Sequence, residues 1–210
     1  MTELEKMQKG MIYEPTEPSL MKVRSNCHIL CQKYNKVKET NTKKRNRILD
    51  KLIPNKMEGM MLQGPIFFDY GINTIVGKNF YANFNFTVLD CALVTIGDNV
   101  FVGPNVSIMT PIHPFIPEER NMFVNEKGLL TDLEYASPIK IGNDCWIASN
   151  VVICGGVSIG DGCVIGAGSV VTRDIPSGSF AAGNPCRVIR KITKEDSIYF
   201  KKNLFESETK

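Results

Sequence analysis

His113 is the side chain whose type and position best suit acid–base chemistry. The chain has two histidines, and His113 stands beside Pro114 at the start of a long segment, residues 111–138. An imidazole titrates near neutral pH, so it can take the proton of a hydroxyl group and make that hydroxyl a competent nucleophile. The alternative is a surface-loop histidine without a role. His28 falls in a stretch expected to be helical, and we assign it no role.

The rest of the chain must position this histidine, and its dominant feature is an aliphatic residue at every sixth position. The step is kept by Ile141, Ile147, Ile153, Ile159, Ile165 and Val171, by Val76, Ala82 and Val88, and, after a slip of two residues, by Ile96, Val102 and Ile108. A period of six fits neither an amphipathic helix nor an alternating strand. It predicts a short strand followed by a tight corner, and three such sides predict a triangular coil of about 18 residues that stacks on its neighbours as a parallel β-solenoid.

Corners need residues that tolerate a positive φ, and the repeat supplies them. They are glycines or the polar pairs Asp98-Asn99, Asn143-Asp144 and Asp161-Gly162. Cys145 and Cys163 occupy the same place in successive coils, so we expect one to lie above the other. The step is interrupted between Pro111 and Pro138, and we expect this segment to leave the wall as an excursion that lines a binding face.

The chain divides into three parts. Residues 1–60 are expected to form an N-terminal helical extension, in which Thr2 and Glu5 make a capping-box pattern at the start of the first helix. Residues 61–190 are expected to form the solenoid with its excursion at about 111–138. Residues 191–210 are expected to form a C-terminal tail, also helical.

Composition limits the function classes. With 210 residues, 43% of them hydrophobic, the chain suits one globular domain with a small appendage. Its net charge is +3, and residues 1–60 hold 13 Lys and Arg against 7 Asp and Glu. The basic group Lys43, Lys44, Arg45 and Arg47 lacks interleaved aromatic residues, so we interpret it as a solvated helix face and expect no nucleic-acid partner.

No segment of the sequence indicates export or a membrane. No apolar run is long enough to span a bilayer, and the polar start MTELEKMQKG has no secretory signal. The seven cysteines are odd in number and lack paired metal-ligand spacing. They predict reduced thiols in a cytoplasmic protein.

Four stretches carry a resemblance to a known family. DYGINTIVGKNFYANFNFTVLD, VTIGDNVFVGPNVSI, IGAGSVVTRDIP and AAGNPCRVIRKI resemble the maltose and galactoside O-acetyltransferases, which include nodulation-factor acetylases, and TELEKMQKGMIYEP is similar to their helical extension. The similarity covers about residues 2–195. It implies an all-β, left-handed parallel β-helix of hexapeptide repeats. It also implies direct transfer of an acetyl group from acetyl-CoA to a hydroxyl of a sugar or related acceptor, with His113 as general base.

The resemblance also implies an acceptor site and an assembly. Asn83 matches an active-site asparagine that holds the acceptor and stabilises the tetrahedral intermediate. Asp69 and Asp90 match acceptor-side positions, and an aspartate at 69 is typical of the maltose type. Glu134 could orient the His113 imidazole. Each of these could instead be an ordinary turn or loop residue. The family forms homotrimers with active sites between subunits.

The predicted coenzyme A contacts lie along the later coils. By resemblance they are Ser149, Ala167, Thr172, Arg173, Arg187 and Arg190. Ser149 would receive the pantetheine or thioester, Ala167 would leave room for the pantetheine arm, and the arginines would meet the phosphates. Trp146 would pack beside the acyl donor or in a subunit interface. The chemistry requires no metal.

Three alternatives remain open. A γ-type carbonic anhydrase shares the solenoid but needs three histidines around zinc, and this chain has two, one of them in the extension. A structural solenoid without activity is a second alternative. The third is an acetyltransferase whose acceptor is a non-sugar hydroxyl or an amine, because Pro111, Ile112 and a longer excursion depart from the family's pattern.

Overall fold

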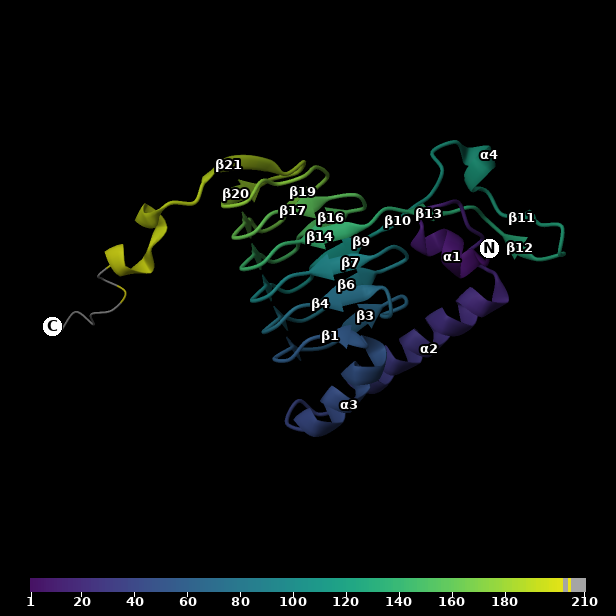
Figure 1. Cartoon of the computed structure of the whole chain (residues 1–210), viewed down its shortest axis with the longest axis horizontal. Helices are drawn as coiled ribbons and strands as arrows, with labels where there is room; N and C mark the ends of the chain where they lie inside the picture. Colours follow the sequence, from purple (N-terminus) through teal and green to yellow (C-terminus); the bar gives the residue numbers. More distant parts are fainter. Residues whose placement is uncertain (202–203, 205–210) are drawn as a thin grey trace.

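The structure, a computed structural model, describes residues 1–201 and 204, and most of them form a parallel β-solenoid (Figure 1). Its wall has three sheets, with strand orders β1-β4-β7-β14-β17, β2-β5-β8-β15-β18-β20-β21 and β3-β6-β9-β16-β19. We call these the first, second and third sheets. Because consecutive strands of the chain fall in successive sheets, each coil gives one strand to each face. This is the architecture that the six-residue step predicts.

Every strand of the wall is short, as a coil with three sides requires. The first sheet contains β1 (Asn55–Lys56), β4 (Thr74–Val76), β7 (Val94–Ile96), β14 (Ile139–Ile141) and β17 (Ser158–Ile159). The second contains β2 (Met61–Leu62), β5 (Tyr81–Ala82), β8 (Phe101–Val102), β15 (Trp146–Ile147), β18 (Val164–Ile165), β20 (Ser179–Ala182) and β21 (Arg187–Lys191). The third contains β3 (Ile66–Phe68), β6 (Phe86–Leu89), β9 (Ser107–Met109), β16 (Val152–Cys154) and β19 (Val170–Val171).

The coils have 20 residues below the excursion, 18 directly above it, and 16 at the last level, where Val164 pairs with Phe180. Above the excursion Lys140 pairs with Ser158, which is the predicted 18-residue repeat. Below it Val76 pairs with Ile96, so the prediction of 18 is wrong there and the coil has 20 residues. The two additional residues lie between a strand of the third sheet and the next strand of the first sheet, a turn that we call the third corner. They account for the slip of two in the aliphatic step.

The core is a set of stacked aliphatic columns. On the first sheet Val76, Ile96, Ile141 and Ile159 are each 1% exposed, and the corresponding residues of the other two sheets are equally buried. Cys145 and Cys163 are both buried on adjacent coils, and the amide next to Cys145, that of Trp146, donates to the Cys163 carbonyl at 2.8 Å. The predicted stacking of these cysteines is confirmed.

The other two corners are closed by side-chain ladders with positive φ. Between the first and second sheets, Asn79 donates to Asn99 at 3.0 Å and Asn99 donates to Asp144 at 2.9 Å, each with φ of 55°. Between the second and third sheets, a turn that we call the second corner, Asn85, Asn105 and Asn150 form the same ladder. The corner chemistry predicted at Asn99 and Asp144 is therefore confirmed.

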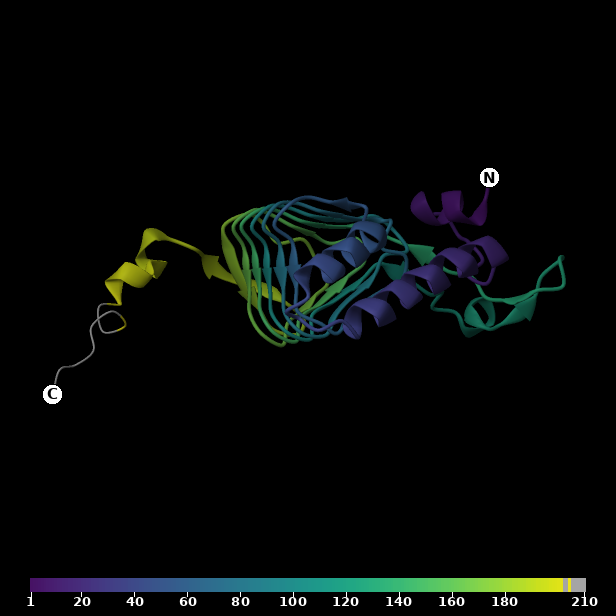
Figure 2. The same ribbon diagram turned by 90° about the horizontal axis from the view of Figure 1, so that it is seen from below.

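The extension has three helices, of which the second and third cover one end of the solenoid, whereas the first lies beside Tyr135–Ala136 of the excursion (Figure 2). The helices are α1 (Glu3–Gln8), α2 (Pro18–Asn35) and α3 (Thr42–Leu52), and Thr2 forms the predicted capping box with Glu5 at the start of α1. Apolar residues of α2 and α3, among them Tyr34 and Leu52, pack into the solenoid core.

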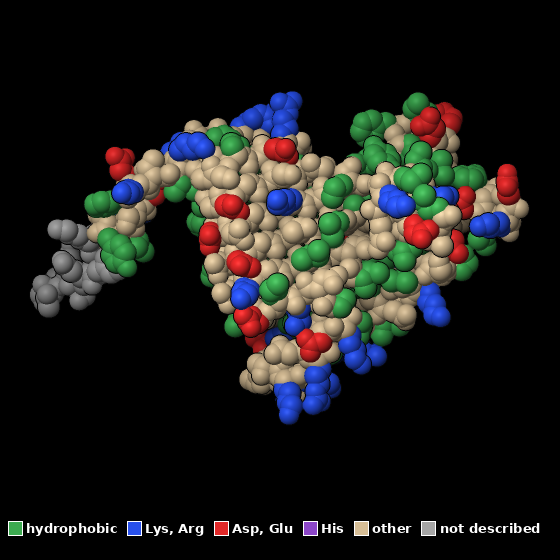
Figure 3. All heavy atoms as spheres, in the orientation of Figure 1, with side chains coloured by type: hydrophobic (Ala, Val, Ile, Leu, Met, Phe, Trp, Pro, Cys, Tyr) green, Lys and Arg blue, Asp and Glu red, His purple; other side chains and the backbone are tan. Residues whose placement is uncertain are grey.

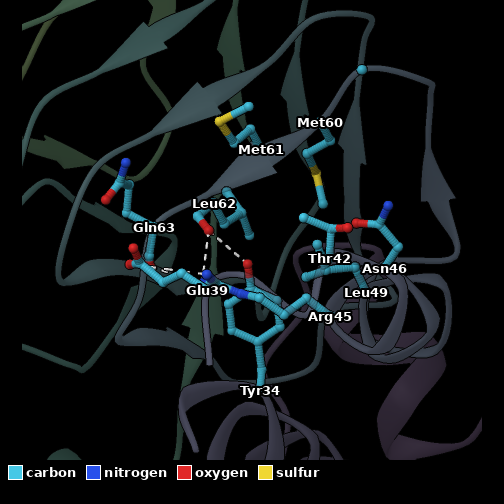
Figure 4. A pocket seen from close by; sticks show the side chains of 11 residues that line it. Tyr34, Glu39, Thr42, Arg45, Asn46, Leu49, Met60, Met61, Leu62 and Gln63 are labelled. Carbon is cyan, nitrogen blue, oxygen red and sulfur yellow. Dashed lines mark hydrogen bonds and ion pairs between the residues drawn. The ribbon is translucent and has the colours of Figure 1, made fainter. Parts of the chain in front are cut away.

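Arg45 of α3 is not the solvated cation that we expect from the sequence. It is 8% exposed and lies 4.4 Å from the centre of the Tyr34 ring, beside a cavity of about 330 Å³ (Figure 4). Its guanidinium donates to the carbonyl of Leu62 at 3.0 Å and to that of Gln63 at 3.3 Å. Lys43, Lys44 and Arg47 are exposed as predicted. Arg45 thus joins the helical cap to the first coil.

The C-terminal part leaves the solenoid. β21 pairs antiparallel with β20, and two single-turn 3-10 helices, Lys194–Asp196 and Ile198–Phe200, follow in a segment that projects from the wall (Figure 1). Residues 202–203 and 205–210 of the predicted helical tail lie outside the described residues. Among the described residues, no helix is both long and apolar enough to cross a membrane.

Arg45→Ala should lower the free energy of unfolding by at least about 2 kcal/mol, because it removes charge-assisted hydrogen bonds from two carbonyls at the base of the solenoid. Arg47→Ala, on an exposed position of the same helix, should change it by less than about 0.5 kcal/mol. Urea unfolding at one protein concentration measures both. Equal effects of the two substitutions would contradict the role given to Arg45.

Candidate active site

The excursion leaves the wall at the third corner above β9. Its base is an antiparallel pair of β10 (Pro111–Ile112) and β13 (Tyr135–Ala136). Between them lie α4 (Pro117–Arg120) and a hairpin of β11 (Phe123–Val124) and β12 (Leu130–Thr131). His113 follows β10 directly, so a two-stranded base fixes the point where this histidine emerges from the wall.

Two carboxylates flank the His113 imidazole. Nδ1 lies 3.4 Å from Oδ2 of Asp132, and Nε2 lies 3.6 Å from Oε1 of Glu134. The histidine side chain is 49% exposed, whereas those of Asp132 and Glu134 are 14% and 15% exposed. The ring is therefore about half accessible to a ligand, and each of its two nitrogens has a carboxylate neighbour.

Asp132 was missed by the sequence analysis, although a signal for it exists. Asp132 and Glu134 are two residues apart in an extended segment, so their side chains point to the same side. Glu134 lies beside His113, where we expect an orienting carboxylate, and its orienting role remains a prediction.

Glu134 is held from the other side by the N-terminal extension. The Tyr13 hydroxyl donates to Glu134 Oε2 at 2.5 Å, and the backbones of the two residues exchange hydrogen bonds of 2.9 and 3.1 Å. Tyr13 is 1% exposed. A residue 121 positions away in the chain thus fixes the carboxylate beside His113.

Asp69 lies lower on the third corner and is paired with the second histidine. His28 Nε2 of α2 lies 3.2 Å from Asp69 Oδ1, although the sequence gives His28 no role. Both line a cavity of about 250 Å³ between α2 and the third sheet, whose wall is partly apolar through Phe67 and Leu89. A pocket with a carboxylate, an imidazole and an aromatic face suits a polar ligand with an apolar side, such as a sugar ring.

Asp90 is placed differently from the acceptor contact that we predict for it. It is 0% exposed, and its carboxylate accepts hydrogen bonds from the amides of Tyr70 and Gly71 at 2.8 and 3.1 Å and from the Thr74 hydroxyl at 2.9 Å. Burial raises the pKa of Asp90 to about 6, although these three donors oppose the rise. In this structure Asp90 ties one coil's third corner to the next, facing inward.

Asn83 is not beside His113 in the single chain. It follows β5 at the second corner, and its side-chain oxygen accepts from the Phe84 amide at 2.8 Å. Ser149 and Ala167 follow β15 and β18 at the same corner, two and three coils higher. The width of the third sheet separates these three residues from the corner that carries the excursion. Within one chain, the acceptor-side asparagine and the histidine therefore stand on different edges.

The remaining predicted coenzyme contacts are spread over two places. Thr172 and Arg173 follow β19 at the third corner, above the excursion. Arg187 and Arg190 lie in β21, where Arg190 makes a two-point ion pair with Asp196 at 2.6 and 2.7 Å. Trp146 points outward from β15 and is 54% exposed. These residues line the outside of the upper coils, and their contacts with coenzyme A remain predictions.

Comparisons with known proteins agree with the fold and its end caps. Residues 6–56 match the family described as maltose acetyltransferase hexapeptide capping motif, and residues 138–173 match bacterial transferase hexapeptide repeats. The galactoside O-acetyltransferase of Escherichia coli is 40% identical over 95% of this chain and 94% of its own length.

Two solved structures are similar over nearly the whole chain. The maltose O-acetyltransferase from Clostridium difficile 630 is 43% identical with a TM-score of 0.82, over 92% of this chain and 99% of that one. A galactoside acetyltransferase solved with coenzyme A is 40% identical with a TM-score of 0.84, over 93% and 94% of the two chains. The chain belongs to the maltose and galactoside O-acetyltransferases, and its solenoid is the left-handed parallel β-helix of these hexapeptide-repeat enzymes.

The raised pKa of Asp90 predicts a specific pH dependence of stability. A carboxyl whose pKa rises on folding, here from 3.8 to about 6, binds its proton more tightly in the folded state, so its contribution to stability falls as the pH rises through that window. Relative to Asp90→Asn, which exchanges no proton, the wild-type free energy of unfolding should fall by about 1 kcal/mol between pH 5 and pH 7. Urea unfolding of both proteins at the two pH values measures this difference, and parallel pH dependences would refute it.

Proposed function

We propose that this enzyme transfers the acetyl group of acetyl-CoA directly to a hydroxyl of a sugar or related acceptor, with His113 as general base. The observation that carries the proposal is the half-exposed His113 ring beside Asp132 and Glu134, on the excursion of an acetyltransferase solenoid. A similar enzyme binds coenzyme A, which supports this donor.

The reaction needs one proton carrier and one stabiliser of negative charge. A ring nitrogen of His113 takes the proton of the acceptor hydroxyl while the hydroxyl oxygen attacks the thioester carbonyl of acetyl-CoA. The tetrahedral intermediate collapses and expels the coenzyme A thiolate, which receives the same proton from the imidazolium. Asn83 contributes the amide that stabilises the oxyanion or holds the acceptor. The two carboxylates stabilise the imidazolium between the two steps.

The acceptor binds at the third corner of the solenoid, and acetyl-CoA binds along the coils above the excursion. Asp69, with the cavity next to it, offers hydrogen-bond acceptors for acceptor hydroxyls. Ser149 and Ala167 line the path of the pantetheine. Arg173, Arg187 and Arg190 supply positive charge for the phosphates, and Arg190 exchanges Asp196 for a phosphate when the coenzyme binds.

The active enzyme is a homotrimer in which one subunit supplies His113 and the next supplies Asn83. Support comes from their places on different edges of the third sheet, which a single chain does not bring together. Support also comes from the apolar surface of the excursion, where hydrophobic side chains gather around α4 and β11 (Figure 3). Phe115, Ile116 and Val124 there are 89%, 52% and 66% exposed, more than a solvated loop needs.

His113→Ala should lower kcat for acetyl transfer at least about 100-fold, because general-base assistance contributes that much or more. Binding of acetyl-CoA, followed by calorimetry, should stay unchanged, since the histidine acts on the acceptor. The assay follows release of the coenzyme A thiol with a panel of sugars, polyols and amines. Turnover in His113→Ala equal to the wild type with each accepted substrate would refute the assignment of the base.

Shared sites predict complementation between two inactive subunits. When His113→Ala and Asn83→Ala chains are coexpressed in equal amounts, every mixed trimer contains one site with both native residues. About a quarter of all sites in the unselected mixture are then intact, whereas purified mixed trimers, with one intact site of three, should have about a third of the wild-type activity. If the two chains carry different affinity tags, successive purification on both tags isolates the mixed trimers. Activity no higher than that of either parent would place His113 and Asn83 in different sites or in one subunit.

A further inference from the structure

Tyr13 connects the N-terminal extension with the proposed base. It lies between α1 and α2, and its ring packs in a small core with Met7, Leu20, Tyr70 and Cys91. Its hydroxyl donates to Glu134 Oε2 at 2.5 Å, and its backbone pairs with that of Glu134 in both directions. Packing thus fixes the ring of Tyr13, the Glu134 carboxylate fixes its hydroxyl, and two hydrogen bonds fix its backbone.

This contact determines how Glu134 faces His113. A carboxylate has two oxygens, and when Tyr13 holds Oε2 the remaining Oε1 is directed at the ring, 3.6 Å from Nε2. Burial raises the pKa of the Tyr13 hydroxyl far above its ordinary value, so the hydroxyl remains a proton donor throughout the working pH range of an enzyme. The hydroxyl therefore keeps Glu134 in this orientation throughout that range.

Asp132 provides the contrast. Among the described residues, its side-chain oxygens have one hydrogen-bonding or ion-pair partner, His113, at 3.4 Å. The imidazole consequently has one carboxylate neighbour that is fixed by a third residue and one that is free to yield its place to an acceptor hydroxyl. Because of this asymmetry, the orientation of the His113 ring depends on Glu134 and on Tyr13, which fixes Glu134.

We propose that Tyr13 is a positioning residue for acetyl transfer, which orients the His113 ring through Glu134 without touching either substrate. The inference rests on the proposed role of His113 as the base. It assigns to the N-terminal extension an indirect part in catalysis, through Glu134, in addition to closing the solenoid.

Tyr13→Phe tests this inference because it removes only the hydroxyl. We expect kcat to fall about 10-fold, since a base that is free to rotate spends less time in a productive orientation. The KM for acetyl-CoA should stay unchanged. Tyr34→Phe is the matched control, because Tyr34 is equally buried at 1% exposed and its hydroxyl donates at 2.6 Å to the Leu62 carbonyl, far from the excursion. It should leave kcat unchanged.

A double-mutant cycle separates positioning from a general loss of structure. In the Glu134→Ala background, Tyr13→Phe should have no further effect on kcat, because the intermediary is already absent. An unchanged kcat in Tyr13→Phe alone would overturn the inference, as would the same 10-fold loss in both backgrounds. The proposed function fails by a different result, full activity in His113→Ala, so the two failures are distinguishable.

Discussion

Hydrogen bonds between stacked coils are the constraint on which the rest of the structure depends. The amides of Gly77, Gly97 and Gly142, one above another, donate to the Ile96, Ile141 and Ile159 carbonyls of the next coil at 2.8 to 2.9 Å. This pairing holds only if every coil keeps its strands in register, so an insertion within a face would break the ladders above and below it. The chain can change length only at a corner. The longer lower turns, the excursion and the candidate base all lie at the third corner for this reason.

The sequence predicts what repeats and misses what occurs once. The three faces, the buried columns and the turn residues Asn99 and Asp144 follow from periodicity, because each is repeated at every level of the wall. The burial of Arg45 depends on how two helices meet the first coil, and no periodic signal reports such a contact. Tyr13 and Glu134 are far apart in the sequence, and no pattern around either residue predicts their contact. Asp90 faces inward because the third-corner turns of the lower coils are two residues longer. The slip of two residues in the sequence indicates this extra length, but only the register of the strands shows which side chains the longer turn directs inward.

The candidate site was predictable in its parts more than in its arrangement. His113 was found from its type and its place at the break in the repeat, and the resemblance supplied Asn83 and Asp69. That His113 and Asn83 stand on different edges follows from counting faces, a step that requires each corner to be assigned to its sheets. Asp132 and His28 are identified only from tertiary contacts, in which Asp132 lies beside His113 and His28 beside Asp69. The N-terminal extension thus has two structural roles. Arg45 joins it to the first coil at the base of the solenoid, and Tyr13 joins it to the excursion.

The change of coil length at the excursion divides the wall into two halves with different capacities for growth. Above it, one 18-residue step relates strands of all three sheets before the last step shortens to 16 residues, so duplication of the 18-residue unit would extend the prism without disturbing its neighbours. Below it, each level has individual partners in the helical cap, and a duplicated coil would separate Asp90 from Tyr70 or Tyr13 from Glu134. The height of the upper wall is therefore open to evolutionary change, whereas the distance from the cap to the excursion is fixed.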